Sequence, residues 1–212
     1  MQVWAFDEHR IGLQPILRRV WAKRGKRPVA VVHPRYEWRY LHGFVEPRTG
    51  RTFWWLTSWV DTQAFSLVLH EFAAWLKEQR SQCCEADQET EEEVFLVVDQ
   101  AGWHTGEVEV PPGITLKFLP PYSPELQPAE RLWTLSDEPL CNRLFDSIQD
   151  MEEVQCHRCC QLQDQTELIR AKTLFHWSGS FSSQELKGFH RIGGALSGGV
   201  GDIVGRDAPQ ES

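Results

Sequence analysis

The sequence predicts an α/β protein in which a sheet is covered by helices. Val3–Phe6 and Val94–Val98 are continuous apolar runs, the pattern of strands that are covered on both faces. A helix is expected between them, because apolar side chains recur at helical spacing along one stripe. The stripe consists of Phe65, Val68, Leu69, Phe72 and Leu76. From Pro128 to about Trp177 the composition is again helical.

Between the two apolar runs, the sequence also predicts an antiparallel meander. Three segments rich in Val, Trp, Tyr and Phe are separated by turn residues: Val29–His33, Trp38–Val45 and Thr52–Trp59. Asp61 is the expected N-cap of the helix, which should end near Arg80.

A further strand is expected at Ile114–Leu119, after the second apolar run. The prolines at 120, 121 and 124 then predict an irregular connection, because proline breaks both ladders and helices.

Length and composition favour one domain. The chain has 212 residues, 41% of them hydrophobic, which is enough for one sizeable core and leaves little room for a second. We expect this domain to cover residues 1–177. Residues 178–212 hold eight of the 15 glycines and few large apolar side chains, so they are expected to form a flexible tail.

The sequence predicts a cytoplasmic protein without membrane contact. No apolar run reaches the roughly 20 residues needed to cross a bilayer, and the N-terminus lacks the basic and apolar regions of a signal peptide. The six cysteines are therefore expected to be reduced. Cys156, Cys159 and Cys160 include one C-x-x-C, but a structural zinc site usually needs a second ligand pair. We interpret them as buried helix cysteines.

The charge is unevenly distributed. The formal net charge is −8, yet residues 18–51 carry ten Lys and Arg against two acids. A bipolar molecule of this kind can still present a basic face to phosphate. The candidates for phosphate or DNA contact are Arg18, Arg19, Lys23, Arg24, Lys26 and Arg27. Residues 85–93 carry six acids and no base, for which a solvated loop is an equally good interpretation.

Three carboxylates are candidates for a metal site. Both apolar strands are followed by an aspartate, Asp7 and Asp99, and the carboxyl ends of neighbouring parallel strands lie on one edge of a sheet. Pro128 fits a first helical turn, which would place Glu130 near that edge. Taken singly, these acids are more often turn residues, caps or partners of a helix dipole. Together they would repel one another unless a hard cation such as magnesium or manganese were bound.

Three motifs resemble a known family. They are Phe-Asp-Glu at 6–8, Val-Asp-Gln-Ala-Gly-Trp-His at 98–104, and Leu-Pro-Pro-Tyr-Ser-Pro-Glu-Leu-Gln-Pro-Ala-Glu-Arg-Leu-Trp at 119–133. They resemble the DDE superfamily endonuclease domain and, more narrowly, mariner-like bacterial insertion-sequence transposases. Gln127 stands where the family usually has Asn, and either amide can hydrogen-bond the turn. The resemblance covers roughly residues 3–177.

The resemblance implies a ribonuclease-H-like fold, a five-stranded mixed sheet flanked by helices. It implies that Asp7, Asp99 and Glu130 bind two magnesium or manganese ions and carry out DNA cleavage and strand transfer on element ends and target DNA. His104 matches a histidine often found in the family, and either contacts the scissile phosphate or is a hydrogen-bonded loop residue. Glu8 is expected to support the neighbouring acid without a catalytic role of its own.

Family members usually carry N-terminal helix-turn-helix domains, whereas six residues precede Asp7 here. We therefore expect a split or frameshifted reading frame or a decaying copy, and the expected partners besides DNA are a separate helix-turn-helix chain or a second copy of this chain. Two alternatives stay open. One is an inactive remnant that only binds DNA or a partner, and the other is a nuclease or integrase of the same fold.

Overall fold

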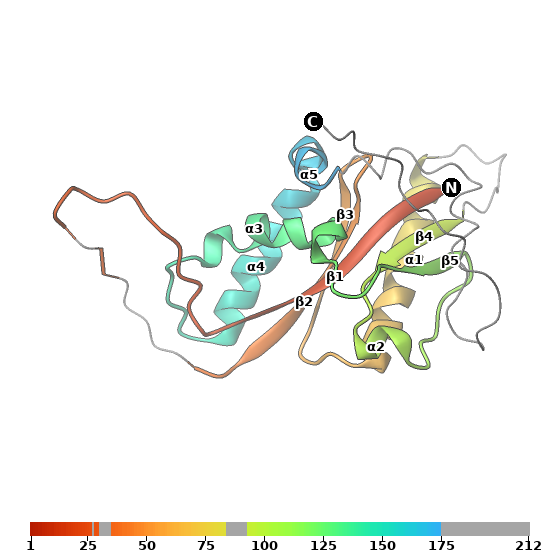
Figure 1. The fold of residues 1–212 in the computed structure, drawn as a ribbon, viewed down its shortest axis with the longest axis horizontal. Helices are drawn as coiled ribbons and strands as arrows, with labels where there is room; N and C mark the ends of the chain where they lie inside the picture. Colours follow the sequence, from red (N-terminus) through yellow and green to blue (C-terminus); the bar gives the residue numbers. More distant parts are fainter. Residues whose placement is uncertain (27, 30–34, 84–92, 175–212) are drawn as a thin grey trace, which may run out of the picture.

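The computed structural model describes residues 1–26, 28–29, 35–83 and 93–174. Its centre is a five-stranded sheet in the order β3-β2-β1-β4-β5. The strands are β1 (Gln2–Gly12), β2 (Trp38–Glu46), β3 (Arg51–Thr57), β4 (Val94–Val98) and β5 (Ile114–Phe118). β1, β2 and β3 are antiparallel neighbours, whereas β4 is parallel to both β1 and β5. The predicted mixed five-stranded sheet is confirmed (Figure 1).

β1 is longer than predicted. It was expected to end at Phe6 but continues to Gly12, because β2 extends the ladder from the pair Asp7–Gly43 to the pair Gly12–Trp38. β4 accompanies β1 only as far as the pair Ala5–Val97. Asp7 therefore lies inside a strand, two residues beyond the point where the parallel partner leaves it.

The predicted meander exists, but its first strand is β1. Residues 28 and 29 are not in a strand, and residues 30–34 lie outside the described part of the chain. β3 ends at Thr57 rather than Trp59. In the β2–β3 turn, Gly50 has φ +78°, and its N–H donates to the carbonyl of Glu46 at 2.8 Å.

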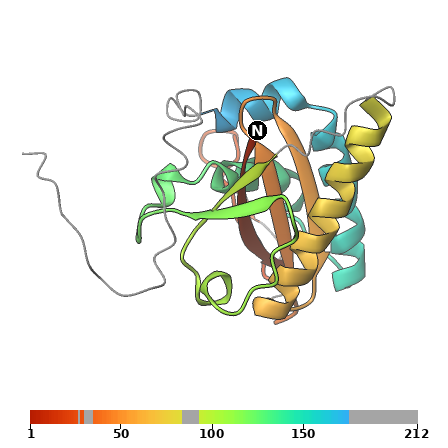
Figure 2. The ribbon, with the colours of Figure 1, turned by 90° about the vertical axis from the view of Figure 1, so that its right-hand side faces the viewer.

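One face of the sheet is covered by α1 (Thr62–Cys83), with the short α2 (Gly102–Thr105) beside its beginning (Figure 2). Asp61 caps α1 as predicted, because its Oδ1 accepts the N–H of Ala64 at 2.7 Å. The helix continues three residues past Arg80. All members of the predicted apolar stripe are buried against side chains of the sheet such as Trp4 and Phe44.

The opposite face carries α4 (Ile148–Gln163) and α5 (Thr166–Thr173), together with shorter turns. The prediction of helix throughout 128–177 is wrong in its first part. Three short elements occupy it: η2 (Ala129–Leu132), α3 (Trp133–Ser136) and η3 (Glu138–Leu140). Pro139 and Asn142, whose φ is +55°, prevent one continuous helix. The end of this stretch, 175–177, and the predicted tail, 178–212, lie outside the described residues.

Two further expectations concern cysteines and membranes. Cys159 is buried in α4 as interpreted, but Cys156 and Cys160 are exposed on the same helix. No helix in the described ranges is both long and apolar enough to cross a membrane.

Candidate active site

Asp7 projects from β1 towards the α3 side of the sheet. Its Oδ2 accepts a hydrogen bond from Trp133 Nε1 at 3.0 Å. Burial raises the pKa of Asp7 to about 7, against the lowering effect of the Trp133 bond, and the charges of Glu8, Glu130 and Asp99 raise it further. Asp7 thus lies in a negative, poorly solvated environment.

Asp99 follows β4 directly, and its side chain is half exposed. Its Oδ1 accepts two hydrogen bonds, one from His104 Nδ1 at 2.6 Å and one from the N–H of Ala101 at 3.0 Å. The His104 bond lowers the pKa of Asp99, partial burial opposes it, and the Ala101 bond lowers it again. Asp99 is therefore an ionised carboxylate with one oxygen already held.

Glu130 lies in the first turn of η2, exposed to solvent. Partial burial raises its pKa, and the charges of Asp99 and Glu125 add to this. The turn is fixed from beneath by Ala129 and Leu132, both fully buried.

Gln127 ties this turn to β1. The amide Nε2 donates to the carbonyl of Phe6 at 2.9 Å, and Oε1 accepts the N–H of Ala129 at 3.4 Å. The side chain is 3% exposed. The expected hydrogen bond of this amide to its turn is confirmed, and the second bond anchors the turn of Glu130 to the strand position next to Asp7.

The three acids therefore come from β1, the end of β4 and η2, and each pair is close enough for one charge to raise a partner's pKa. Among the described residues, no three His, Cys, Asp or Glu side chains are drawn together at metal-binding spacing. Within the same ranges, Asp7 Oδ1, Asp99 Oδ2 and both oxygens of Glu130 accept no hydrogen bond. The donor set fits hard divalent ions in its chemistry, and its role as a ligand set stays a prediction.

The structure places His104 in the interior as a hydrogen-bonded residue, one of the two alternatives left open for it, although it lies in α2 and not in a loop. Its side chain is 1% exposed, and its ring packs between Phe6 and Phe65, with centroid distances of 5.5 and 4.4 Å. Because α2 packs against α1, this ring faces the interior, and its predicted contact with a phosphate does not fit this placement. Burial lowers the pKa of His104, but its bonds to Asp99 and Glu8 outweigh that effect and raise it to about 9.

Sequence analysis missed two contacts of Glu8. Oε2 of Glu8 lies 3.2 Å from His104 Nε2, and Oε1 accepts a hydrogen bond from Trp103 Nε1. The side chain is 8% exposed. The adjacency of Trp103 and His104 in the motif at 98–104 was the one signal present, but nothing in the sequence identified their partner.

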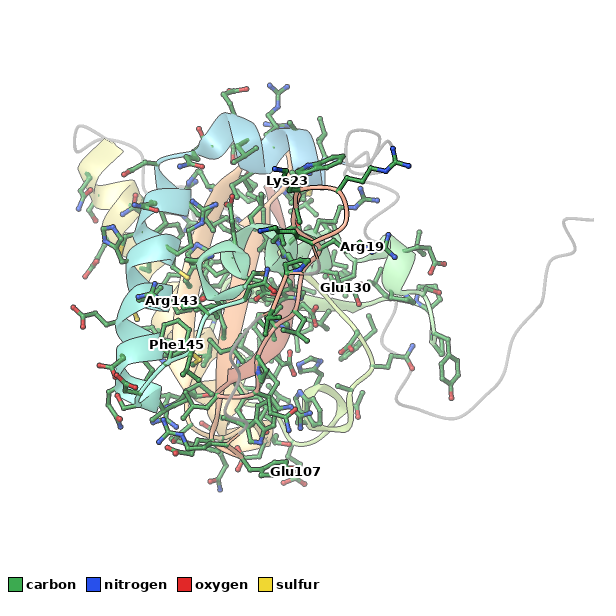
Figure 3. All side chains as sticks on the ribbon, turned by 90° about the vertical axis from the view of Figure 1, so that its left-hand side faces the viewer. Arg19, Lys23, Glu107, Glu130, Arg143 and Phe145 are labelled. Carbon is green, nitrogen blue, oxygen red and sulfur yellow. The ribbon has the colours of Figure 1, made fainter. Side chains whose placement is uncertain are left out.

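The predicted basic loop projects from the body between β1 and β2 (Figure 1). Its described basic residues are all exposed: Arg18, Arg19, Lys23, Arg24 and Lys26. Figure 3 shows Arg19 and Lys23 on the same side of the molecule as Glu130. Arg27 lies outside the described residues. DNA contact by this loop stays a prediction.

The base of the loop is fixed to the body. The backbone N–H and C=O of Arg18 bond to the side-chain amide of Asn142, each at 3.0 Å, and Arg18 Nη2 donates to the carbonyl of Thr134 at 3.1 Å. The guanidinium of Arg18 is thus partly engaged.

A mixed sheet of this order, with helices on both faces and acids beside its central strands, defines a ribonuclease-H-like protein. Residues 2–152 match the family model of the DDE superfamily endonucleases, and the chain belongs to this family. It is 34% identical over 143 residues to the uncharacterized protein y4pE/y4sA of Sinorhizobium fredii (strain NBRC 101917 / NGR234). That alignment covers 66% of this chain and 97% of the relative.

The fold is similar to that of Mos1 mariner transposase. The pre-cleavage Mos1 transpososome matches with a TM-score of 0.53 at 15% identity, and the Mos1 mariner paired end complex with Mn matches with 0.50 at 16%. Each match covers 82% of this chain and 56% of the Mos1 chain, so the chain spans little more than half of that transposase. The expected ribonuclease-H-like fold and the resemblance to the DDE superfamily endonuclease domain are confirmed, and the fold is that of a mariner transposase catalytic region.

Proposed function

We propose that this chain is the catalytic domain of a mariner-like bacterial insertion-sequence transposase, which cuts DNA and transfers strands with the help of divalent metal ions. The supporting observation is that Asp7 of the central strand β1, Asp99 at the end of β4 and Glu130 of η2 lie near enough for each pair to interact electrostatically, in a chain that matches the DDE superfamily endonucleases. Solved Mos1 paired end complexes with Mn or Mg support the same kind of ion here.

Asp7, Asp99 and Glu130 would hold two magnesium or manganese ions through their unbonded oxygens. Bound ions of this kind activate a water or a 3′-hydroxyl and stabilise the leaving oxygen of an in-line displacement. The chain itself contributes orientation. Trp133 fixes the carboxylate of Asp7, His104 fixes that of Asp99, and Glu130 on its exposed turn keeps the freedom to adjust to substrate.

Phosphate contacts would come from the basic loop, which lies on the same side as Glu130. Such contacts orient a duplex but carry no direct sequence information. Selection of the element's ends would therefore depend on helix-turn-helix domains, supplied in cis or by a separate chain.

The test is a nicking assay with magnesium or manganese on duplexes with terminal-repeat and random sequences. We expect weak nicking with little sequence preference, and a loss of about 100-fold or more in Asp7→Asn, Asp99→Asn and Glu130→Gln. Glu78→Gln, an exposed carboxylate of α1, is the matched control. A supplied helix-turn-helix chain should confer preference for the repeats. Failure to nick under any of these conditions would favour an inactive remnant that only binds DNA or a partner.

A further inference from the structure

We propose that His104 and Glu8 are positioning residues for Asp99: Glu8 holds the His104 ring, and the ring holds one carboxylate oxygen so that the other faces the site. The inference rests on the proposed function in one respect, the role of Asp99 as a metal ligand. The array formed by Glu8, His104 and Asp99 is itself a feature of the fold, because these residues come from β1, α2 and the end of β4.

Glu8 is next to Asp7 in sequence but lies on the other face of the sheet. Side chains alternate along a strand, and the neighbours of Glu8 on its own face, Trp4 and Phe6, are buried against α1. Ala5 belongs to the cluster on the opposite side. Glu8 is therefore separated from the carboxylate of Asp7 by the sheet, and its oxygens are directed to Trp103 and His104 instead.

The His104 ring has little freedom to turn. It is wedged between Phe6 and Phe65, and its backbone N–H donates to the carbonyl of Ala101 at 2.9 Å. Each ring nitrogen faces a carboxylate: Nδ1 lies 2.6 Å from Asp99 and Nε2 lies 3.2 Å from Glu8. The carboxylate of Asp99 accepts from Nδ1. The contact of Nε2 with Glu8 Oε2 is close but lacks hydrogen-bond geometry, since neither atom has a hydrogen-bond partner among the described residues, so Glu8 restrains the ring by proximity.

The consequence appears at Asp99. Oδ1 is held twice, by His104 and by the N–H of Ala101. Two bonds to one oxygen fix the plane of the carboxylate and leave Oδ2 as the oxygen that is free to bind a metal ion. Residues that hydrogen-bond to a metal ligand and so orient it typically contribute about 10–100-fold to metal affinity or activity.

Trp103 completes the array. Its indole N–H donates to Oε1 of Glu8, while Oε2 lies 3.2 Å from His104 Nε2. The array thus explains why a tryptophan and a histidine stand side by side in the motif at 98–104.

The test measures Mn²⁺ affinity from the electron paramagnetic resonance signal of unbound Mn²⁺. We expect His104→Ala to weaken binding by about 10-fold or more. His104→Asn keeps one donor near Asp99 and should restore part of the affinity, while Glu8→Gln should cause a smaller loss. His70→Ala and Glu78→Gln are exposed α1 controls and should bind as the wild type does.

A double variant separates positioning from direct ligation. If Glu8 acts only through His104, Glu8→Gln adds nothing in the His104→Ala background. An equal loss in both backgrounds would make Glu8 an independent ligand and overturn the proposal. So would wild-type affinity in His104→Ala. If that variant does not fold, Trp103→Phe, which removes only the bond to Glu8, and His104→Asn are compared in its place.

A second readout does not depend on metal. The ¹⁵N resonances of His104 in the metal-free protein should show that Nδ1 carries a hydrogen, as its bond to the Asp99 carboxylate requires. A ring whose Nδ1 carries no hydrogen would overturn the array even if Mn²⁺ binds. Failure of the wild type to bind Mn²⁺, with the hydrogen on Nδ1, would instead count against the proposed function alone.

Discussion

Trp133 and Asp7 are 126 positions apart, yet the indole N–H of Trp133 donates to Oδ2 of Asp7 at 3.0 Å. The ring is fixed from two sides, by stacking on His9 at 5.0 Å and by an edge contact with Trp54 at 6.3 Å. The long motif at 119–133 therefore contributes more than Glu130. Its last residue orients the first acid of the site.

Trp133→Phe tests this relationship. An aromatic ring and its stacking are kept, but Asp7 is deprived of its indole bond, so we expect Mn²⁺ affinity and nicking to fall by about 10-fold. The free energy of unfolding should change by only about 1 kcal/mol. Trp4→Phe is the matched control, because it removes an indole bond of equal length to Gln2 Oε1 on the other face of the sheet. Equal effects of the two substitutions on Mn²⁺ affinity would contradict a specific role for Trp133.

The second prediction concerns Gly50 in the β2–β3 turn. It has φ +78°, and a Cβ there would lie 1.9 Å from the carbonyl oxygen of Thr166. Gly113 has a similar φ, +83°, with no atom within 4 Å of its Cβ position. Gly113→Ala should cost about 1–2 kcal/mol of unfolding free energy from the left-handed backbone alone. Gly50→Ala adds a clash with the start of α5 and should cost at least about 3 kcal/mol. Urea unfolding measures the free energy of unfolding of both variants. Equal losses would show that α5 does not pack closely against the β2–β3 turn.

The third prediction is a pH dependence that arises at His42. Its Nε2 lies 2.9 Å from Thr57 Oγ1, whose own proton is donated to the carbonyl of Trp59. His42 is therefore neutral with the proton on Nε2, and the buried Nδ1 has no hydrogen-bond partner in the part of the chain that the structure describes. Burial lowers the pKa of His42 from 6.5 to about 4; of the two charged groups that act on it, Glu8 opposes this shift and His104 adds to it.

Because the folded pKa of His42 is depressed, the unfolded chain binds the proton first as pH falls. The stabilisation is complete above about pH 6.5 and is lost between pH 6.5 and 4, by an upper limit of about 3 kcal/mol. Unfolding free energies at pH 7, 5.5 and 4 should show this loss in the wild type and in His70→Asn, an exposed control. His42→Phe should remove it. An unchanged slope in His42→Phe would assign the pH dependence to other groups.

The sheet could be predicted from the sequence wherever a strand is apolar on both faces or flanked by clear turns. β4, β5 and the stripe of α1 were located this way. The prediction ended β1 too early, because the polar second half of this strand is stabilised by pairing with β2. Such pairing between distant segments leaves no local hydrophobic signal in the sequence. The break in the helical region after Pro128 was missed for a similar reason. Good helix-forming composition there is overruled by Pro139 and by the packing of short turns on the sheet.

In the candidate site, too, residues with a local sequence signal could be predicted, and their partners from distant segments could not. Asp7, Asp99 and Glu130 could be selected because a strand end and a proline-set turn are visible locally. The partners that orient them could not. Trp133 and Glu8 act across 126 and 96 positions, and no spacing rule connects such residues.

The last prediction concerns the basic loop and the salt dependence of DNA binding. Arg19, Lys23, Arg24 and Lys26 are exposed, whereas Arg18 is excluded because its guanidinium bonds to Thr134. Removal of one phosphate-binding side chain should reduce the slope of log K against log salt by about 0.9. Replacing all four with Gln should therefore flatten the slope by up to about 3.6 and weaken binding to every duplex alike, since side chains that bind phosphate do not read sequence.

The measurement is fluorescence anisotropy on a labelled duplex at several salt concentrations. Arg48→Gln with Lys77→Gln, two exposed basic residues outside the loop, controls for net charge. Net charge changes by two in the control and by four in the loop variant, so a pure charge effect should give the control half of the loop variant's change in slope. If the control flattens the slope by half as much as the loop variant does, net charge alone explains the change. The loop would then not be a preferred site of phosphate contact. An unchanged control with a flattened loop variant would place the duplex against residues 19–26, on the side of the molecule that carries Glu130.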